Sequence, residues 1–253
     1  MELQSQLVPK LKALRLSGIL ETLDVRNREA ISEKCTYVEF LQKLLEDEVE
    51  RRGEKQLSLR LRRSNLDPAK TLEAFDFSFN PNLNRQQIYD LATCGFVERA
   101  ESLFLCGPAG VGKSHLAHAI GHEACRRGYD VLFTRTSAML SHLHAGRADG
   151  SYDRRLASYH RPEVLILDDF GLKPMRPPAM EDFYEVVEGR YSRGSIILTT
   201  NRSFTEWPEL FDNPVLASAA LDRLAHGATQ IVMTGDSYRA KGPRSRVAVA
   251  QTS

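Results

Sequence analysis

The sequence predicts an α/β protein in which a five-stranded parallel sheet is covered by helices on both faces and preceded by a small all-helical domain. Two patterns predict this class. From residue 102 onward, short unbroken apolar runs alternate with helix-like stretches, which is typical of parallel strands buried on both sides. Residues 1–63 instead repeat apolar side chains at near-helical spacing.

The composition fits a soluble chain of two unequal parts. With 253 residues, 42% of them hydrophobic and 26% charged, the chain is long enough for one sizeable domain and a smaller module. The formal net charge of +1 says little about partners. Any argument about nucleic acid must therefore rest on where the charges lie.

Two absences bear on location. No apolar run approaches about 18 residues, the length that spans a membrane, and the N-terminus lacks the apolar core of a signal peptide. The four cysteines are scattered without a C-x-x-C pair. We therefore expect a reduced, cytoplasmic chain with no membrane partner.

The first 66 residues are expected to form the helical domain. Apolar residues recur at near-helical spacing from Leu7 to Leu23, and Thr36 with Glu39 is a possible capping box that opens a helix over Tyr37–Glu50. One apolar face of that helix is expected to hold Phe40, Leu41, Leu44 and Leu45. The domain could contact DNA or a partner protein, or mediate self-association.

A basic run ends this domain. Between residues 51 and 63, six positive residues minus one acid, Glu54, give a local charge of +5. The positive residues are Arg51, Arg52, Lys55, Arg60, Arg62 and Arg63. The run is either a solvated helix face or a contact to nucleic-acid phosphates. For the second case, the candidate DNA-binding residues are Arg51, Arg52, Arg62 and Arg63.

Residues 67–101 are expected to link the two domains. Asn65–Pro68 breaks the helical pattern and marks the boundary. Three aromatic residues then alternate toward a second proline: Phe75, Phe77 and Phe79. They either pack beside an adenine base or belong to the core. A helix over residues 84–93 then leads to the first strand.

The five expected strands lie between residues 102 and 240. They are Leu103–Cys106, Val131–Phe133, Val164–Leu167, Ile196–Leu198 and Ile231–Met233. The crossover from the second to the third strand, residues 137–161, is unusually long and contains two helix-like pieces separated by Gly146–Gly150. Its candidate DNA-binding residues are Arg147, Arg154 and Arg155.

A phosphate-binding loop follows the first strand. The loop matches G-x-x-x-x-G-K-[ST] in full: Gly107, Pro108, Ala109, Gly110, Val111, Gly112, Lys113 and Ser114. A strand that enters such a loop and continues into a helix turns backbone N–H groups toward a phosphate. We expect Lys113 to reach the β- and γ-phosphates, and the Ser114 hydroxyl to be a ligand of Mg²⁺.

Two carboxylates end the third strand. Asp168 is expected to hold Mg²⁺, because the end of this strand should lie beside the phosphate loop. Asp169 is expected to face the γ-phosphate and to orient or deprotonate the attacking water.

Three further residues complete the predicted nucleotide site. Asn201 follows the fourth strand and would sense the γ-phosphate if that strand lies between the first and third. The alternative is that Asn201 and Arg202 simply form the turn after the strand. Arg223 precedes the fifth strand and would stabilise phosphate charge on the nucleotide of a neighbouring subunit, or else forms an intrahelical or surface salt bridge. Arg239 is a weaker candidate of the same kind, ahead of a basic tail at 241–253.

Three histidines share one face of the helix after the loop: His115, His118 and His122. The spacing could bind a metal, but this helix must pack on the sheet and the second histidine of H-E-x-x-H is missing. No metal site is expected there. His115 directly follows the loop and is a candidate contact to the nucleotide.

Together these motifs resemble those of an AAA+ ATPase. Three stretches resemble the DnaC/IstB branch of the initiator clade: LEAFDF at 72–77, GPAGVGKSHLA at 107–117 and LDDFG at 167–171. LDRLAHG at 221–227 and GDSYR at 235–239 are similar to IstB-like transposition helper ATPases of bacterial insertion sequences. The resemblance covers nearly the whole chain.

The resemblance implies an AAA+ P-loop core that uses ATP and Mg²⁺, with ATP sites at the interfaces of a homo-oligomer. It implies a regulator of transposition that assembles on double-stranded DNA and recruits or stimulates a partner transposase. The second helix of the 137–161 crossover would then be the clade's DNA-engaging insertion. One departure matters: many AAA+ proteins carry Glu where this chain has Asp169, so hydrolysis could be slow.

Two alternatives stay open. Within the clade, the chain could be a helicase loader like DnaC. From a different class, it could be a nucleotide-gated DNA-binding scaffold whose ATP turnover is incidental.

Overall fold

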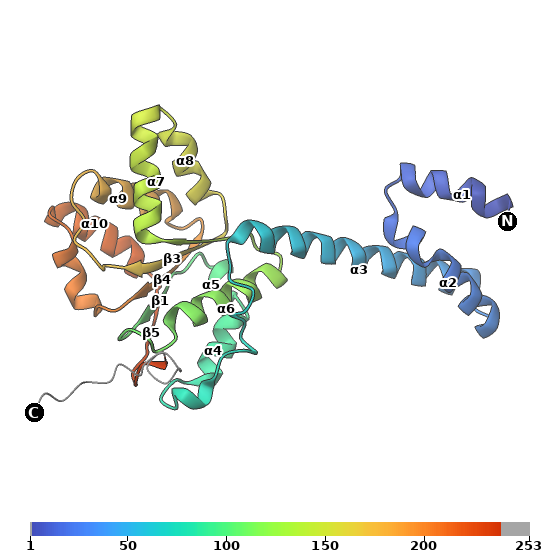
Figure 1. The fold of residues 1–253 in the computed structure, drawn as a ribbon, viewed down its shortest axis with the longest axis horizontal. Coiled ribbons are helices and arrows are strands. Elements are labelled where there is room, and N and C mark those ends of the chain that lie inside the picture. The colour runs from blue at the N-terminus through green and yellow to red at the C-terminus, as the bar shows by residue number, and fades with distance from the viewer. Residues whose placement is uncertain (1, 239–253) are drawn as a thin grey trace, which may run out of the picture. The chain divides into compact units, whose positions relative to one another are not determined.

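The computed structural model describes residues 2–238, with side chains from residue 6 onward. The described residues fall into two compact units, one up to residue 59 and one from residue 60 onward, and each is described by itself below. The division falls inside a helix, whereas the predicted boundary lies at residue 66, just after that helix ends. Figure 1 labels the elements.

The N-terminal unit contains α1 (Glu2–Ala13), α2 (Ser17–Glu33) and most of α3 (Tyr37–Ser64). Its core is small and consists of Leu11, Ile19, Leu23 and Leu44. The predicted capping box opens α3: Thr36 N donates to Glu39 Oε2 (2.7 Å), and Glu39 N donates to Thr36 Oγ1 (3.3 Å).

The predicted apolar face of α3 was wrong in part. Leu44 is buried and Phe40 packs against the core, but Leu41 and Leu45 are 54% and 48% exposed. These two lie with Val38 and Val49 along an open hollow of α3. A helix positions side chains on every side, and within this unit only one side of α3 packs on the small core.

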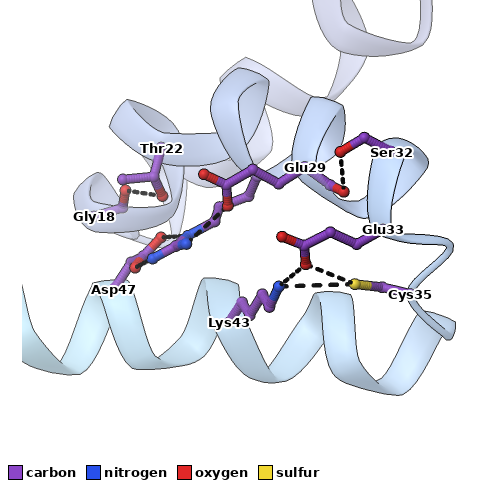
Figure 2. Close-up of polar contacts among 9 residues, drawn as sticks. Gly18, Thr22, Glu29, Ser32, Glu33, Cys35, Lys43 and Asp47 are labelled. Carbon is purple, nitrogen blue, oxygen red and sulfur yellow. Dashed lines mark hydrogen bonds and ion pairs between the residues drawn. The ribbon is translucent and has the colours of Figure 1, made fainter.

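Polar contacts join α2 to α3 where that core is thin. Arg26 pairs with Asp47 through two hydrogen bonds of 2.9 and 2.6 Å, and this guanidinium lowers the pKa of Asp47 to about 2. Figure 2 shows a second contact, in which Lys43 reaches Glu33 and Cys35. These charged contacts therefore help to orient α2 and α3 relative to each other.

The second unit is built on a five-stranded sheet. Its strands are β1 (Leu103–Cys106), β2 (Val131–Arg135), β3 (Val164–Phe170), β4 (Ser195–Thr200) and β5 (Thr229–Val232). The order is β2-β3-β4-β1-β5, and all neighbours are parallel. The predicted fold class is confirmed. Because β4 lies between β1 and β3, the condition set for Asn201 is met.

Helices cover both faces of the sheet (Figure 1). In the linker region the structure has η1 (Phe77–Phe79), α4 (Arg85–Ala92) and α5 (Gly95–Glu98). The others are α6 (Lys113–Arg126), α7 (Thr136–Asp149), α8 (Tyr152–His160), α9 (Ala179–Arg190), η2 (Phe204–Leu210) and α10 (Pro214–Ala225). Gly121 of α6 approaches Ile166 of β3. Leu165 and Leu167 instead join the core formed with α7 to α10.

The long crossover contains two helices, as predicted, but the break is narrower than expected. Gly146 lies inside α7, and the chain turns at Gly150, which has a φ of +73°. A Cβ at Gly146 would lie 3.0 Å from Tyr152 Cα. This glycine therefore allows α7 and α8 to approach each other closely.

Across the described residues, no helix combines the length and apolar character needed to span a bilayer.

Candidate nucleotide-binding site

A cavity of about 350 Å³ opens where β1, β3 and β4 end. It is lined by Lys70, Ala74, Phe75, Asp76, Phe79, Asn80, the stretch 109–115, Asp169, Leu172, Asn201 and Tyr238. The cavity brings together Lys113, Asp169 and Asn201, which are distant in sequence. Gly107 and Pro108, the first two residues of the loop, are not among the residues that line the cavity.

The backbone of the phosphate loop needs its glycines. Gly107 N donates to Thr200 O (3.1 Å), and a Cβ at Gly107 would lie only 2.0 Å from Met233 O. Gly112 has a φ of +99° and directly precedes α6. The loop therefore passes from β1 into the N-terminus of α6, where free N–H groups can bind phosphate.

Lys113 lies at the mouth of this loop. Its ammonium donates to the carbonyl oxygens of Gly107 and Pro108, both at 2.7 Å. These bonds hold a positive charge at the loop, beside the helix N-terminus. The arrangement suits the β- and γ-phosphates of a nucleotide.

Ser114 and Asp168 meet directly. The Ser114 hydroxyl donates to Asp168 Oδ1 (2.7 Å), and Asp168 is only 6% exposed. Thr199 of β4 donates a second hydrogen bond to the same oxygen. The carboxylate is thus held by hydroxyls from the phosphate loop and from the neighbouring strand.

This donor set fits Mg²⁺. A hydroxyl and a carboxylate are oxygen ligands, which Mg²⁺ prefers, and this ion is usually bound by few protein groups together with substrate phosphates. In the described part of the chain, no group of three or more His, Cys, Asp or Glu could hold a metal ion. Ser114 and Asp168 are therefore the residues that would hold Mg²⁺ beside a bound nucleotide.

Asp169 reaches the cavity because β3 contains a bulge. Leu167 pairs with Leu198 and Phe170 with Thr200, so Asp168 and Asp169 together oppose Thr199. Asp169 has a φ of +58°, and its N–H donates to Thr199 Oγ1 (3.0 Å). Bulges near active sites redirect side chains. Here Asp168 is buried while the exposed Asp169 lines the cavity.

Asn201 is the first residue after β4, and its side chain lines the cavity. The next residue, Arg202, points elsewhere and donates from Nε to Gly171 O (2.8 Å). Asn201 thus lines the same cavity as Lys113 and Asp169, where a phosphate sensor would lie. Its role as a sensor remains a prediction.

The histidines of α6 contact the linker. His115 Nε2 lies 2.9 Å from Thr71 O, and His122 Nε2 lies 2.9 Å from Asp67 O. His118 accepts the N–H of Asp67 (3.2 Å), and burial lowers its pKa to about 4. These imidazoles attach the start of the linker to the helix that follows the phosphate loop.

Aromatic residues form the other end of the cavity. Phe75 and Phe79 line it, but Phe77 stacks on Tyr89 (ring centroids 5.9 Å apart). Tyr238 was not predicted to line the site. Its ring contacts Phe79 (4.9 Å), and its N–H donates to Gly110 O (3.0 Å). The only signal in the sequence was the place of Tyr238 within the GDSYR stretch at 235–239. Arg239 of that stretch lies outside the described residues.

Arg223 lies at the opposite end of the sheet from the phosphate loop. It shares a hollow with Ser102 and Ile196, near the amino ends of β1 and β4. Its Nε pairs with Glu188 of α9, and Nη1 donates to Ala219 O (2.9 Å). An inter-helix ion pair therefore exists, so both interpretations of Arg223 stay open.

The candidate DNA-binding arginines of the crossover divide into two kinds. Arg147 pairs with the buried Asp182 (Nε to Oδ1, 3.0 Å), and Arg155 donates to His142 O (2.6 Å) and to Asp149. Arg154 is exposed, with no ion pair among the described residues. Of these three arginines, Arg154 alone has no carboxylate hydrogen-bonded to it among the described residues.

The arginines of α3 divide in the same way. Arg51 pairs with Glu21, and Arg52 donates to Glu48 (2.6 Å). Arg62 and Arg63 are exposed and have no ion pair in the described region. DNA contact by any of these residues remains a prediction.

Comparison with known proteins identifies the family. The family of IstB-like ATP binding proteins matches residues 9–246. A Mycobacterium tuberculosis protein, named as an ATP-binding protein in an insertion sequence, is 45% identical over 237 residues, 93% of each chain. The chain belongs to this family. A second IstB-like relative, named for insertion sequence IS21 of Pseudomonas aeruginosa, is 39% identical over 94% of this chain and 89% of its own.

Solved structures agree on the fold of this IstB-like protein. The DnaC helicase loader superposes with a TM-score of 0.52 at 23% identity, covering 59% of this chain and 87% of its own. DnaI gives 0.57 at 21% identity, covering 68% and 96%. DnaA bound to AMPPCP and single-stranded DNA gives 0.56 at 22% identity, covering 68% and 52%. The IstB-like chain therefore has the AAA+ P-loop fold.

Proposed function

We propose that this IstB-like protein is an ATPase that regulates insertion-sequence transposition on DNA. The observation that carries the proposal is the contact of Ser114 with Asp168 beside a complete phosphate loop. It joins the two protein groups that an Mg²⁺-nucleotide needs. The insertion-sequence names of the relatives support the biological setting.

Each residue of the cavity has a separate task in this proposal. The loop N–H groups and Lys113 bind the phosphates, while Ser114 and Asp168 would hold Mg²⁺. Mg²⁺, when bound, would neutralise charge on the β- and γ-phosphate oxygens. Asp169 accepts a proton from the attacking water or orients it, and Asn201 contacts the γ-phosphate.

A neighbouring subunit completes the site in this proposal. Arg223 would approach the γ-phosphate bound by another copy, where a guanidinium stabilises developing negative charge. ATP would then hold a homo-oligomer together on double-stranded DNA, with exposed arginines such as Arg154 on the DNA phosphates. The nucleotide state would control recruitment or stimulation of the partner transposase.

Sizing of the purified protein tests this proposal. The protein is measured with and without a DNA duplex, each in ATP, in ADP and without nucleotide. We expect the largest assembly with both ATP and duplex. A chain that stays monomeric and ignores duplexes under all these conditions would contradict the proposal.

A strand-transfer assay separates the proposal from its alternatives. The transposase of the same insertion sequence should be stimulated by the protein with ATP. Stimulation of helicase loading instead would favour a DnaC-like loader. If Asp169→Asn binds DNA and stimulates the transposase like the wild type, hydrolysis is incidental and the protein is a nucleotide-gated scaffold.

A further inference from the structure

Asn80 is a buried polar residue with an unused donor. Only 3% of the residue is exposed, and its amide nitrogen Nδ2 has no hydrogen-bond partner among the described residues. Buried amide groups nearly always have partners, because an unpaired one destabilises the fold. Yet Asn80 lines the same cavity as Lys113 and Asp169. An unpaired donor on a residue that lines a cavity suggests that its partner is a ligand.

The backbone holds Asn80 in place. Its N–H donates to Phe77 O (3.3 Å), and its carbonyl accepts the N–H of Leu83 (3.0 Å). Its φ of −126° and ψ of 75° keep it out of the helical region, as expected before Pro81. Two backbone hydrogen bonds therefore fix the position from which the Asn80 side chain extends.

The surroundings of Asn80 suit a flat heteroaromatic ring. The neighbouring Phe79 ring meets Tyr238 almost perpendicularly, at 86°, and both residues line the cavity. Tyr238 is also tied through its N–H to Gly110 of the phosphate loop. A nucleotide whose phosphates lie on the loop would thus find aromatic walls and one carboxamide for its base.

We propose that Asn80 reads the base of the nucleotide and makes the site selective for adenine over guanine. This inference rests on the proposed function of ATP binding. A carboxamide can donate from Nδ2 to a ring nitrogen of adenine and accept at Oδ1 from the adjacent exocyclic amino group. Guanine carries a carbonyl oxygen at that carbon, so an acceptor would face Oδ1. Sites built to pair with an amino group reject such analogues strongly.

The test compares Asn80→Ala with Asn82→Ala. Asn82 is the same residue type two positions on, but it is exposed and does not line the cavity. Dissociation constants are measured for ATP, GTP and inorganic tripolyphosphate with each variant and the wild type. We expect Asn80→Ala to lower the ATP over GTP preference by about 10-fold while leaving tripolyphosphate binding unchanged. Asn82→Ala should match the wild type.

Thermal unfolding without nucleotide separates base recognition from a structural role. Because Nδ2 makes no hydrogen bond to the residues that the structure describes, Asn80→Ala should unfold at a temperature no lower than the wild type. The melting-temperature rise on adding ATP should shrink in this variant alone. Asn80→Asp, which keeps an acceptor but loses the donor, should also lose preference for ATP.

Three results would overturn the inference, and they differ from failure of the proposed function. An unchanged ATP over GTP preference in Asn80→Ala would remove Asn80 from base recognition. An equal loss of ATP and tripolyphosphate binding would make the residue structural, as would a lower melting temperature without nucleotide. If the wild type binds neither ATP nor tripolyphosphate, the proposed function itself fails.

Discussion

The carboxyl and amino ends of the parallel strands differ in how many residues suited to phosphate chemistry a single protomer places there. At the carboxyl end, the Ser114 hydroxyl donates to Asp168, and the neighbouring Lys113 ammonium donates to carbonyl oxygens of the phosphate loop. At the amino end, Arg223 pairs with Glu188 and donates to Ala219 O. The carboxyl end thus joins groups suited to phosphate and Mg²⁺, whereas the amino end places Arg223 in a hollow with other arginines.

The length of the strands keeps Arg223 away from the phosphate loop of the same copy. Arg223 lies near Ser102, just before β1, whereas the phosphate loop follows β1. A strand of this length separates its two ends by roughly 13 Å, since each residue advances about 3.3 Å. If Arg223 acts on a nucleotide, it must act on that of another copy. The following experiments test this division, from the largest expected effect to the smallest.

Lys113→Ala should abolish ATP binding and therefore all ATP turnover. Each hydrogen bond from a charged donor is worth about 10-fold or more in affinity, and this ammonium is expected to contact two phosphates. Equilibrium binding of labelled ATP checks the loss. Lys173→Ala, which removes an exposed lysine outside the cavity lining, is the control. Normal turnover in Lys113→Ala would refute the phosphate assignment at the carboxyl end.

Arg223→Ala should leave ATP binding intact and lower turnover of the assembled protein by about 10³-fold, the usual contribution of an arginine supplied in trans. Arg193→Ala removes an exposed arginine just ahead of β4 and serves as the control. Steady-state phosphate release on duplex DNA is the measurement.

Mixing the two inactive variants sharpens this test. In a mixture of Lys113→Ala with Arg223→Ala, some interfaces join an intact loop to an intact arginine. Partial activity should return, because the two halves come from different copies. A mixture as inactive as its components would contradict action in trans, and full activity of Arg223→Ala alone would leave only the ion pair with Glu188.

Asp169→Asn should keep ATP binding and lower turnover by about 100-fold or more, the range of a lost general base. Asparagine is the suitable replacement because Asp and Asn tolerate a positive φ better than other side chains. Asp169→Glu adds a methylene to a residue in that conformation and should not exceed the wild type. Single-turnover kinetics distinguish these outcomes, and undiminished hydrolysis in Asp169→Asn would exclude the carboxylate from the chemistry.

Arg154→Ala should have the smallest effect, on DNA affinity alone. Removing one phosphate contact should reduce the slope of log affinity against log salt by about 0.9. Arg155→Ala is the matched control, because Arg155 already bonds to His142 O and Asp149. Fluorescence anisotropy on a duplex at several salt concentrations measures both slopes. Identical slopes for Arg154→Ala and wild type would remove Arg154 from the interface.

Local patterns predicted the fold and the phosphate end of the site. The G-x-x-x-x-G-K-[ST] motif predicts a loop between a strand and a helix, so the positions of Lys113 and Ser114 at the start of α6 could be predicted from the sequence. Asp168 followed from the rule that parallel strands end at one edge. Thr199 did not, because its contact with Asp168 depends on the strand order and on the bulge in β3.

Long-range packing decided what the sequence could not predict. Leu41 and Leu45 carry the same helical spacing as buried leucines, yet only the other side of α3 meets the core of its unit. Arg147 looks like a surface charge in sequence, but it pairs with the buried Asp182. Nothing in the sequence predicted a role for Asn80, because its unpaired donor can be recognised only once the surrounding residues are placed.

The contact between Tyr238 and the phosphate loop has a practical consequence. The stretch after β5 passes so close to the loop that a Cβ at Gly110 would lie 2.0 Å from Ser237 Oγ. A chain truncated directly after β5 would keep every strand and the whole loop but lose one wall of the cavity. Purification tags and fusion partners are therefore better attached at the N-terminus, well away in sequence from this wall.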